Sequence, residues 1–342
     1  MNEFELNLQL FADSGTNVNT TTGTANAYTG EVTTSNAMSP GMKTFYDTQL
    51  LENARHKMVF TQLGKKQGLP RNHGKNVEWR KWNTFERSTE PLKEGVIPTG
   101  KNFGQTALSV GIQQFGDYAA ISDVLDMHHV DNVIVGCTEE MSDAAAWTLD
   151  TLTRNVLVAG TNVMYAPKGD TEINSRESLT AECKLTPDVV HKAATWLKKC
   201  KAPKYDGNSY VAVIHPSVAY DLTSSEEWMD IHKYADVTPV FDGEIGKIRG
   251  VRFIESPEAP IIDNGTTKIY ATLFFGKDAF GVIDPEGMGM EMIIKSRGEV
   301  GGPLEQFSTV GWKAETAAKI LYQERMVRVE SGSFYSDVDE VN

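Results

Sequence analysis

The sequence predicts an α+β protein that carries a long projecting arm. Three observations lead to this fold class: one long amphipathic helical pattern, a second half that mixes helical and strand-like patterns, and an extended basic segment, 62–117, that is poor in core residues. A loop of that length inside a compact domain is uncommon and is usually functional or disordered. At 342 residues the chain is long enough for two domains with real cores.

The basic segment predicts a two-stranded arm. Residues 61–110 hold nine Lys and Arg against four Glu, a local charge of +5 in a chain of net charge −13, so the remainder sums to −18. Strand-like runs, Asn76–Trp82 and Thr106–Phe115, flank a middle, Thr84–Gln105, that contains two prolines and three glycines. An isolated hairpin is only marginally stable in water, so we expect the arm to rest on a neighbouring molecule. That favours assembly over catalysis.

The N-terminal region predicts a second, less ordered extension. Residues Ser14–Asn36 are rich in Thr, Asn, Gly and Ser and cannot bury enough apolar surface to offset the entropy of ordering. We expect this segment to stay mobile until it meets a partner. A first helix is expected over 40–59, with Pro40 in its first turn. Residues Met1–Asp13 lack the basic start of a secretory signal, so none is expected.

The strongest helical pattern lies in the middle of the chain, after a strand-like run at Tyr118–Ser122. Asp131 is the expected N-cap and Gly160 the expected end. About 29 residues at 1.5 Å each give a helix roughly 40 Å long, which we interpret as a spine across which a sheet packs. Apolar residues recur along it at spacings of three and four: Ile134, Cys137, Met141, Ala145, Leu149, Leu152 and Val156.

The second half predicts a mixture of helices and strands. A short helix from Pro187 is expected to turn Val190, Ala194 and Leu197 inward, and a buried strand, Tyr210–His215, is followed by a helix over 216–232. The segment 314–318 fits either helix or strand. Further strands are expected at Ile245–Glu255, Lys268–Phe275, Gly289–Lys295, Gly311–Leu321 and Glu324–Glu330.

Composition excludes several classes of protein. The chain is 40% hydrophobic and 23% charged, as ordinary soluble proteins are. It holds no apolar run long enough to span a bilayer, so no membrane partner is expected. The three cysteines lie far apart, which predicts reduced thiols in a cytosolic setting. The net negative charge argues against broad nonspecific binding of nucleic acid, which needs cations to neutralise phosphates.

The sequence offers no arranged catalytic or cofactor site. His128, His129 and Asp131 form the only tight group of metal-ligand residues, but adjacent side chains point apart and no further ligand has suitable spacing. We interpret the group as a loop that leads into a helix. No phosphate-binding loop, nucleophile elbow or zinc-protease motif occurs, so no catalytic residue, metal or cofactor is expected.

Aromatic and basic residues alternate at the start of the arm, where Trp79, Trp82 and Phe85 interleave with arginine and lysine. One interpretation is a stacking platform for nucleic acid. The favoured interpretation is a strand with one face packed and the other against a neighbouring subunit.

Three stretches, in order, resemble the major capsid proteins of tailed bacteriophages, which have the Hong Kong 97-type fold. The first, Met42–Trp82, includes Phe-Tyr-Asp, Gln-Leu-Gly, Leu-Pro and Gly-Lys-Asn-Val-Glu-Trp-Arg. The second, 214–256, includes Ile-His-Pro, Tyr-Asp-Leu and Gly-Lys-Ile-Arg-Gly-Val-Arg-Phe-Ile-Glu-Ser. The third, 274–313, begins with Phe-Phe-Gly-Lys-Asp-Ala and ends with Val-Gly-Trp-Lys. The resemblance covers about residues 40–330.

The resemblance implies a division of the chain into named parts. Residues 1–60 would be the N-terminal arm with the first helix, and 61–117 the extended E-loop that lies over the adjacent subunit. Residues 118–182 with 286–330 would form the peripheral domain, built on the spine helix. Residues 183–285 would form the axial domain around the local symmetry axis, and 331–342 the C-terminal tail.

The resemblance also implies a function. The chain would self-assemble through hexamers and pentamers into the icosahedral capsid shell of a tailed bacteriophage, a virion protein assembled in the host bacterial cytoplasm. The shell would enclose double-stranded DNA without sequence-specific binding, with a scaffold protein, a portal and a decoration protein as expected partners. Two alternatives stay open: an encapsulin-like shell that encloses enzymes, and a hydrolase that uses carboxylates.

Charge points to the residues of the inter-subunit contact. A +5 arm docking on a −18 body is electrostatically complementary, which favours encounter and register more than affinity. Covalent crosslinking through Lys93 or Lys101, as in some relatives, is not carried over, because no local motif marks either lysine. The arm residues expected at the contact are Arg80, Lys81, Arg87, Lys93 and Lys101.

Overall fold

The computed structural model describes residues 58–342 apart from 71–73, 130–131, 206, 230–243, 266, 286–289, 301–303 and 337–338, and the backbone of three short strands nearer the N-terminus. It divides into two units, Met1–Ala54 and Arg55–Asn342. In the first, β1 (Asn17–Thr20), β2 (Gly23–Asn26) and β3 (Val32–Thr33) pair as an antiparallel meander. Composition predicted no such pairing there. The predicted helix 40–59 lies outside the described residues, except for its last two.

The larger sheet of the second unit is mixed. Its order among the described strands is β10-β11-β9-β13-β17-β8, with β12 beside β13. The pairs β9–β11 and β17–β8 are parallel, and the other pairs are antiparallel. The strands are β8 (Val163–Tyr165), β9 (Tyr210–Ile214), β10 (Glu244–Ile248), β11 (Val251–Glu255), β12 (Ile261–Asp263), β13 (Lys268–Phe275) and β17 (Met326–Ser331).

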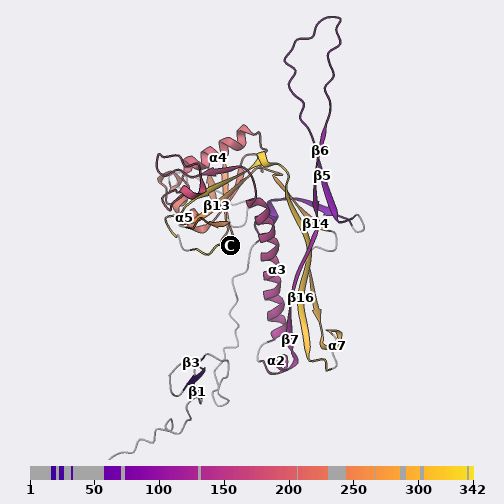
Figure 1. Cartoon of the computed structure of the whole chain (residues 1–342), viewed down its shortest axis with the longest axis vertical. Coiled ribbons are helices and arrows are strands. Elements are labelled where there is room, and N and C mark those ends of the chain that lie inside the picture. The colour runs from indigo at the N-terminus through magenta and orange to yellow at the C-terminus, as the bar shows by residue number, and fades with distance from the viewer. Residues whose placement is uncertain are drawn as a thin grey trace, which may run out of the picture. The chain divides into compact units, whose positions relative to one another are not determined.

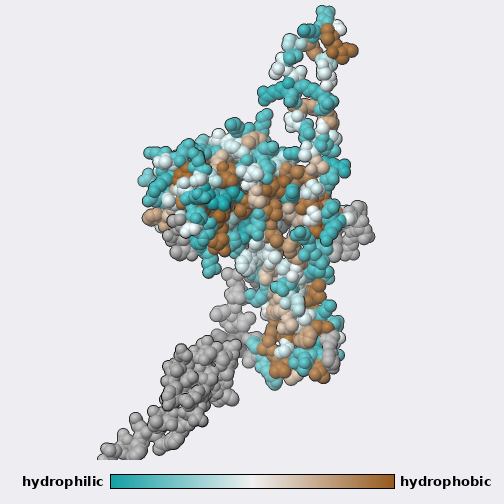
Figure 2. Space-filling model, viewed as in Figure 1, coloured by the Kyte–Doolittle hydropathy of each residue, from teal (hydrophilic) through white to brown (hydrophobic). Residues whose placement is uncertain are grey.

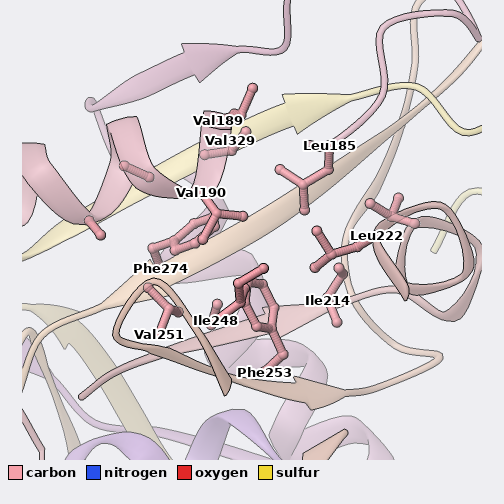
Figure 3. Close-up of a cluster of buried hydrophobic side chains, with 14 of the residues drawn as sticks. Leu185, Val189, Val190, Ile214, Leu222, Ile248, Val251, Phe253, Phe274 and Val329 are labelled. Carbon is pink, nitrogen blue, oxygen red and sulfur yellow. The ribbon is translucent and has the colours of Figure 1, made fainter. Parts of the chain in front are cut away.

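Two helices cover this sheet and form the main core. In α4 (Pro187–Lys199) the predicted inward residues are buried, and Val189 and Ala193 join them. In α5 (Pro216–Thr223), Leu222 is fully buried. Every residue of β9 is buried, as expected for a strand covered on both faces. Figure 3 shows side chains of this cluster, in which α4 and α5 meet Phe253 and Phe274 of the sheet.

A second sheet is built around one long strand, β16 (Phe307–Ile320). Its N-terminal part pairs with β7 (Gln113–Ser122) on one side and β15 (Met290–Lys295) on the other. Its last residues pair with β14 (Phe280–Pro285), which pairs in parallel with β4 (Lys65–Leu69). The ambiguous segment 314–318 is therefore strand. Two further strands, β5 (Asn76–Trp82) and β6 (Gln105–Gly111), form a separate ladder.

The long helix α3 (Val133–Val158) packs against this second sheet (Figure 1). Its N-cap is Asn132, whose side chain accepts the backbone N–H of Val135, and not Asp131 as predicted. Three of the predicted stripe residues, Met141, Ala145 and Leu149, contact Trp312 and Ala314 of β16. The spine prediction is confirmed for this half of the helix.

The stripe predicted for the C-terminal half of α3 is wrong. Leu152 and Val156 are half-buried and join none of the hydrophobic clusters of described residues, whereas Asp150, Thr153, Arg154 and Leu157 are buried. The reason is that this half leaves the second sheet. Leu157 joins a cluster with Met326 of the larger sheet, and Asp150 contacts α1 (Phe60–Leu63). A helix that packs on two surfaces in succession does not keep one straight stripe.

Several predicted boundaries also need correction. The strand expected over 106–115 is interrupted at Ile112, whose side chain is buried, and β7 runs on without a break through Gly116. The helix expected over 216–232 stops at Thr223, and a second helical stretch begins at Glu226. The strand expected over 245–255 is a hairpin, because Arg249 and Gly250 both have positive φ angles, 51° and 84°, and form the turn.

Short elements complete the second unit. They are α2 (Asp123–His128), the 3₁₀ turns η2 (Arg176–Ser178) and η3 (Gln323–Arg325), and α7 (Arg297–Val300). No helix among the described residues is long and apolar enough to cross a lipid bilayer.

Candidate functional site

The arm formed by β5 and β6 is an exposed extension of the second unit, and residues 83–103 beyond the two strands are all exposed. The two strands pair in register from Asn76 with Gly111 to Trp82 with Gln105. Beyond them the backbone N–H of Asn83 donates to Gly104, and then the two limbs continue without ladder pairing to a turn at Lys93–Val96. Figure 1 shows the arm extending away from both sheets. The predicted two-stranded arm is confirmed for residues 76–111. The prediction of 62–117 was too wide, because β4 pairs with β14 and residues 113–117 pair with β16, so both ends belong to the second sheet.

The root of the arm is fixed to the second sheet by apolar contacts. Val77 and Ile112 are buried together with Ile283 of β14, and Trp79 packs against them. The indole of Trp79 lies so close to Gly281 that a Cβ there would come within 2.9 Å of the ring. A glycine at this position lets the indole approach the backbone of β14 closely. Trp79 is therefore an anchor, as the packing interpretation predicted for one face of the strand.

The two limbs are held together above the root by stacked aromatic rings. The ring of Trp82 stacks on Phe103 with centroids 4.2 Å apart, and Phe103 stacks on Phe85 at 5.3 Å. More than half of each side chain remains exposed. Sequence patterns singled out Trp82 and Phe85 but missed Phe103. Extending the strand pairing by two residues would have identified Phe103. Trp82 lies opposite Gln105, so Phe103 is its diagonal neighbour across the hairpin.

The tip of the arm is apolar, a feature that the sequence patterns did not identify. Leu92, Val96 and Ile97 are 79%, 61% and 93% exposed. They flank the turn in which the backbone N–H of Val96 donates to Lys93 and Gly95 takes a φ of +76°. Figure 2 shows apolar surface at the end of the arm. Large aliphatic side chains exposed together at the end of an extension are typical of a contact with another molecule.

The five cations predicted for the contact are spread along the arm and do not form one cluster. At the root, Arg80 pairs with Glu78 at 3.0 Å and the Lys81 ammonium lies 5.1 Å from the centre of the Tyr322 ring. Lys101 donates to the backbone carbonyl of Glu86 and so joins the two limbs. Arg87 and Lys93 are exposed and form no ion pair with another described residue.

The residues considered for chemistry occupy structural positions. His128 ends α2, and the backbone N–H of His129 donates to Leu125, while Asp131 lies outside the described residues. His215 is the N-cap of α5, where its Nδ1 accepts the backbone N–H of Ser217, and the helix begins at Pro216 as predicted.

Sequence patterns also missed a buried charge cluster in the larger sheet. Glu330 is fully buried and accepts two hydrogen bonds from Arg176, at 2.6 and 2.7 Å, and one from Arg328 at 2.9 Å. Arg328 also donates to the carbonyl of Val158 at the end of α3. Nothing in the local sequence marks this cluster, because Arg176 lies 154 residues from its partner.

The family model that matches this chain, and three solved structures that resemble it, all describe phage capsid proteins. Residues 119–285 match the model of a family described as phage capsid protein. No curated protein matches the sequence. Among solved structures, the capsid of cyanophage P-SCSP1u is 16% identical with a TM-score of 0.65, and the match covers 86% of this chain and 94% of that one.

Two more capsid structures show the same similarity. The capsid of Ralstonia phage GP4 is 13% identical with a TM-score of 0.67, covering 91% of this chain and 100% of that one. The cyanophage Pam1 capsid is 13% identical with a TM-score of 0.69, covering 89% and 99%. At such low identity these matches establish a shared fold.

Proposed function

We infer that this chain, which has the Hong Kong 97-type fold of tailed-phage capsid proteins, is the structural subunit of a phage capsid shell. The family model and the fold together support a structural, non-enzymatic role in the virion. The capsid structures that match are phage particles, which does not favour the encapsulin alternative.

The apolar tip of the arm is the observation that carries this function. Three aliphatic side chains held in water at the end of an extension cost free energy in an isolated subunit. Burying each of them on a neighbour would contribute up to about 1.5–3 kcal/mol before the cost of ordering is subtracted. A contact from the arm of one copy to the body of the next is heterologous, and such contacts form rings when the rotation between copies closes.

The five arm cations belong to the same proposed contact. Arg87 and Lys93 lie on the free part of the arm and can pair with acidic groups of the adjacent copy. Lys101 ties the limbs, Lys81 lies over the ring of Tyr322 at the root, and Arg80 pairs with Glu78 of its own strand. Exposed charge pairs contribute little affinity, so their role is to direct encounter and register.

The parts of the chain take the roles known for this fold. In the proposal, residues 1–60 are the N-terminal arm, 61–117 the E-loop, 118–182 with 286–330 the peripheral domain, 183–285 the axial domain and 331–342 the tail. Strand pairing puts β8 and β17 in one sheet with β9 and β13. In the proposal, β8 and β17 therefore extend the sheet of the axial domain.

The shell's further partners follow from the role. The subunits assemble in the host bacterial cytoplasm, with a separate scaffold protein or the N-terminal arm guiding closure. The shell encloses double-stranded DNA and connects to a portal, and a decoration protein can bind outside. A wall with net negative charge would let packaged DNA slide past it instead of holding it.

A tip variant tests the function. Leu92, Val96 and Ile97 are all changed to Ser, and Val124, Leu304 and Val341, which are 61%, 72% and 52% exposed elsewhere, are changed to Ser as a matched control. Shells are counted by electron microscopy and sedimentation, and folding is followed by thermal unfolding. We expect the tip variant to fold normally and form no shells, while the control assembles. Normal shells from the tip variant would contradict the role of the arm.

The contents of the shell distinguish the alternatives. Particles purified from cells that also produce the DNA-packaging proteins are treated with nuclease and opened. Protected double-stranded DNA is the expected content. Particles that hold a folded enzyme and no DNA would point to an encapsulin-like compartment.

A further inference from the structure

A pocket of about 260 Å³ lies at the root of the arm, between β4, β5 and the turn η3. Its lining includes four cations, Lys65, Arg80, Lys81 and Arg325, and a single carboxylate, Asp278, counted over the described residues. The local charge is therefore positive in a chain whose net charge is −13. A concave site with an excess of one charge concentrates ions of the opposite sign.

Two of the four cations, Lys81 and Arg325, are held in place but not neutralised, whereas Arg80 is paired with Glu78 at 3.0 Å. Both Lys81 and Arg325 lie against the ring of Tyr322, with the Arg325 guanidinium 3.8 Å from its centroid. Arg325 also donates to the carbonyl of Lys277 at 3.3 Å. These contacts fix the positions of the two charges without cancelling them, since a ring and a neutral carbonyl carry no net charge. Asp278 forms no ion pair within 4 Å with any described cation.

A hydrogen-bond donor is also left over at this site. The indole N–H of Trp79, a lining residue, is buried and has no hydrogen-bond partner among the described residues. Buried N–H groups are almost always paired, so an unpaired one calls for an explanation. An acceptor supplied by another molecule would be one, and it would reach the nitrogen only after a small shift of the surrounding side chains, because the atom is buried in the isolated chain.

We propose that this pocket binds a carboxylate side chain of a second copy of the chain. The inference rests on the proposed function, in which neighbouring copies meet at the arm. The rest of each copy carries a charge of −18, so acidic groups are the commonest charged groups that a neighbour presents. A carboxylate accepts hydrogen bonds from ammonium, guanidinium and indole donors alike.

The shape of the site favours a side chain over nucleic acid. Proteins that bind DNA without sequence preference present open rows of cations that follow the phosphate backbone. Here the cations converge on a small pocket that also contains Asp278, which would repel a duplex. A volume of about 260 Å³ leaves room for an acidic side chain.

Crosslinking of mixed shells tests the proposal. Subunits labelled with ¹⁵N and unlabelled subunits are co-assembled and treated with a carbodiimide, which joins lysines to carboxylates in direct contact. We expect Lys65 or Lys81 to be joined to an Asp or Glu in pairs of one heavy and one light peptide. Lys168, which pairs with Glu182 of its own chain at 2.9 Å, is the control and should give peptides of one label only. Links from the pocket lysines in one label only would overturn the proposal.

A charge-removal variant gives an independent readout. In Lys65→Met with Lys81→Met the aliphatic stems remain, and Lys198→Met with Lys199→Met on the exposed side of α4 is the matched control. We expect the pocket variant to keep the thermal stability of the wild type while the subunit concentration needed for shells rises at least tenfold. Assembly at the wild-type concentration would overturn the proposal. Shells that form normally but lose their DNA would assign the pocket to phosphates instead. If wild-type subunits never assemble, the proposed function itself fails, and this inference with it.

Discussion

The carboxylate of Asp150, in the C-terminal half of α3, accepts the backbone N–H of Thr61 at 2.9 Å and its hydroxyl at 3.0 Å. It also accepts the backbone N–H of Val59 at 3.1 Å. The short helix α1 has no cap from its own N-cap residue, Val59, so Asp150 supplies the cap from another element. This buried carboxylate thus fixes the short helix α1 to the spine helix.

Replacing Asp150 should loosen that junction. We expect Asp150→Ala to lower the free energy of unfolding by about 2–3 kcal/mol, because it leaves three donors without their charged acceptor. Thr61→Val, which removes only the hydroxyl bond, should cost less than half as much. Urea unfolding of both variants measures the difference. Equal losses would show that the backbone cap contributes nothing.

Neutralising Glu330 should destabilise the larger sheet. Glu330→Gln leaves the buried Arg328 and the half-buried Arg176 without their shared carboxylate, and breaking a buried ion pair costs about 3–5 kcal/mol. Glu182→Gln removes a carboxylate whose side chain is 67% exposed and pairs with Lys168, and it is the control, expected to change stability little. Chemical denaturation measures both, and a loss at Glu330 as small as the control's would contradict this account.

The C-terminal segment should loosen in acid. Burial lowers the pKa of His215, although the nearby carboxylates of Asp339 and Glu258 act the other way. Burial would raise the pKa of Asp339, but hydroxyl bonds from Tyr270, Ser217 and Ser336 lower it below its ordinary value. Both groups therefore bind protons more readily in the unfolded chain. Their contribution to stability is present at neutral pH and is lost as pH falls, for the histidine from about 6.5 and for the carboxylate below about 4.

Melting temperatures measured between pH 7.5 and pH 3.5 show whether stability falls on acidification, as expected. His215→Asn keeps an acceptor for the Ser217 N–H and should flatten the decline between pH 7 and pH 5. Asp339→Asn should lower the melting temperature at pH 7 and flatten the decline below pH 4. His191→Asn, at an exposed position of α4, is the control and should follow the wild type. A wild-type protein that gains stability on acidification over this range would refute the assignment.

Gly116 should not tolerate a side chain. It pairs with Lys313 inside the sheet, and a Cβ on it would lie 2.6 Å from the carbonyl oxygen of Trp312. We expect Gly116→Ala to cost about 1–3 kcal/mol through forced separation of β7 from β16. Gly68→Ala, in β4, meets no atom within 4 Å and should be nearly neutral. Thermal unfolding of the pair is the measurement, and similar stability for the two variants would show that the strands adjust freely.

Local patterns predicted the elements whose contacts are local or repetitive. The arm, the first half of the spine helix and the fully buried strand β9 follow from charge, periodicity and β-branched composition. The second half of α3 could not be predicted in this way. Arg154 is buried there because it donates to the carbonyl of Glu258, 104 residues away, and no periodicity encodes such a partner.

The candidate site, too, was predicted from the sequence only where its features depend on neighbouring residues. The sequence predicted a basic arm and named its five cations, yet it gave no sign that Lys81 lies over Tyr322 or that Phe103 ties the limbs. The apolar tip was present in the sequence as Leu92, Val96 and Ile97. Only the extension of the arm away from other described residues shows that these side chains stay exposed and are not part of a core.

The sequence by itself determined that this chain is an α+β protein with a projecting basic arm, because element type and charge are carried by neighbouring residues. The tertiary structure decided which charges are buried, where the arm is anchored and which side chains its tip presents. Those properties depend on residues brought together from distant parts of the chain, as when Gly281 receives the ring of Trp79. Packing at that distance is set by the fold as a whole, which no local pattern specifies.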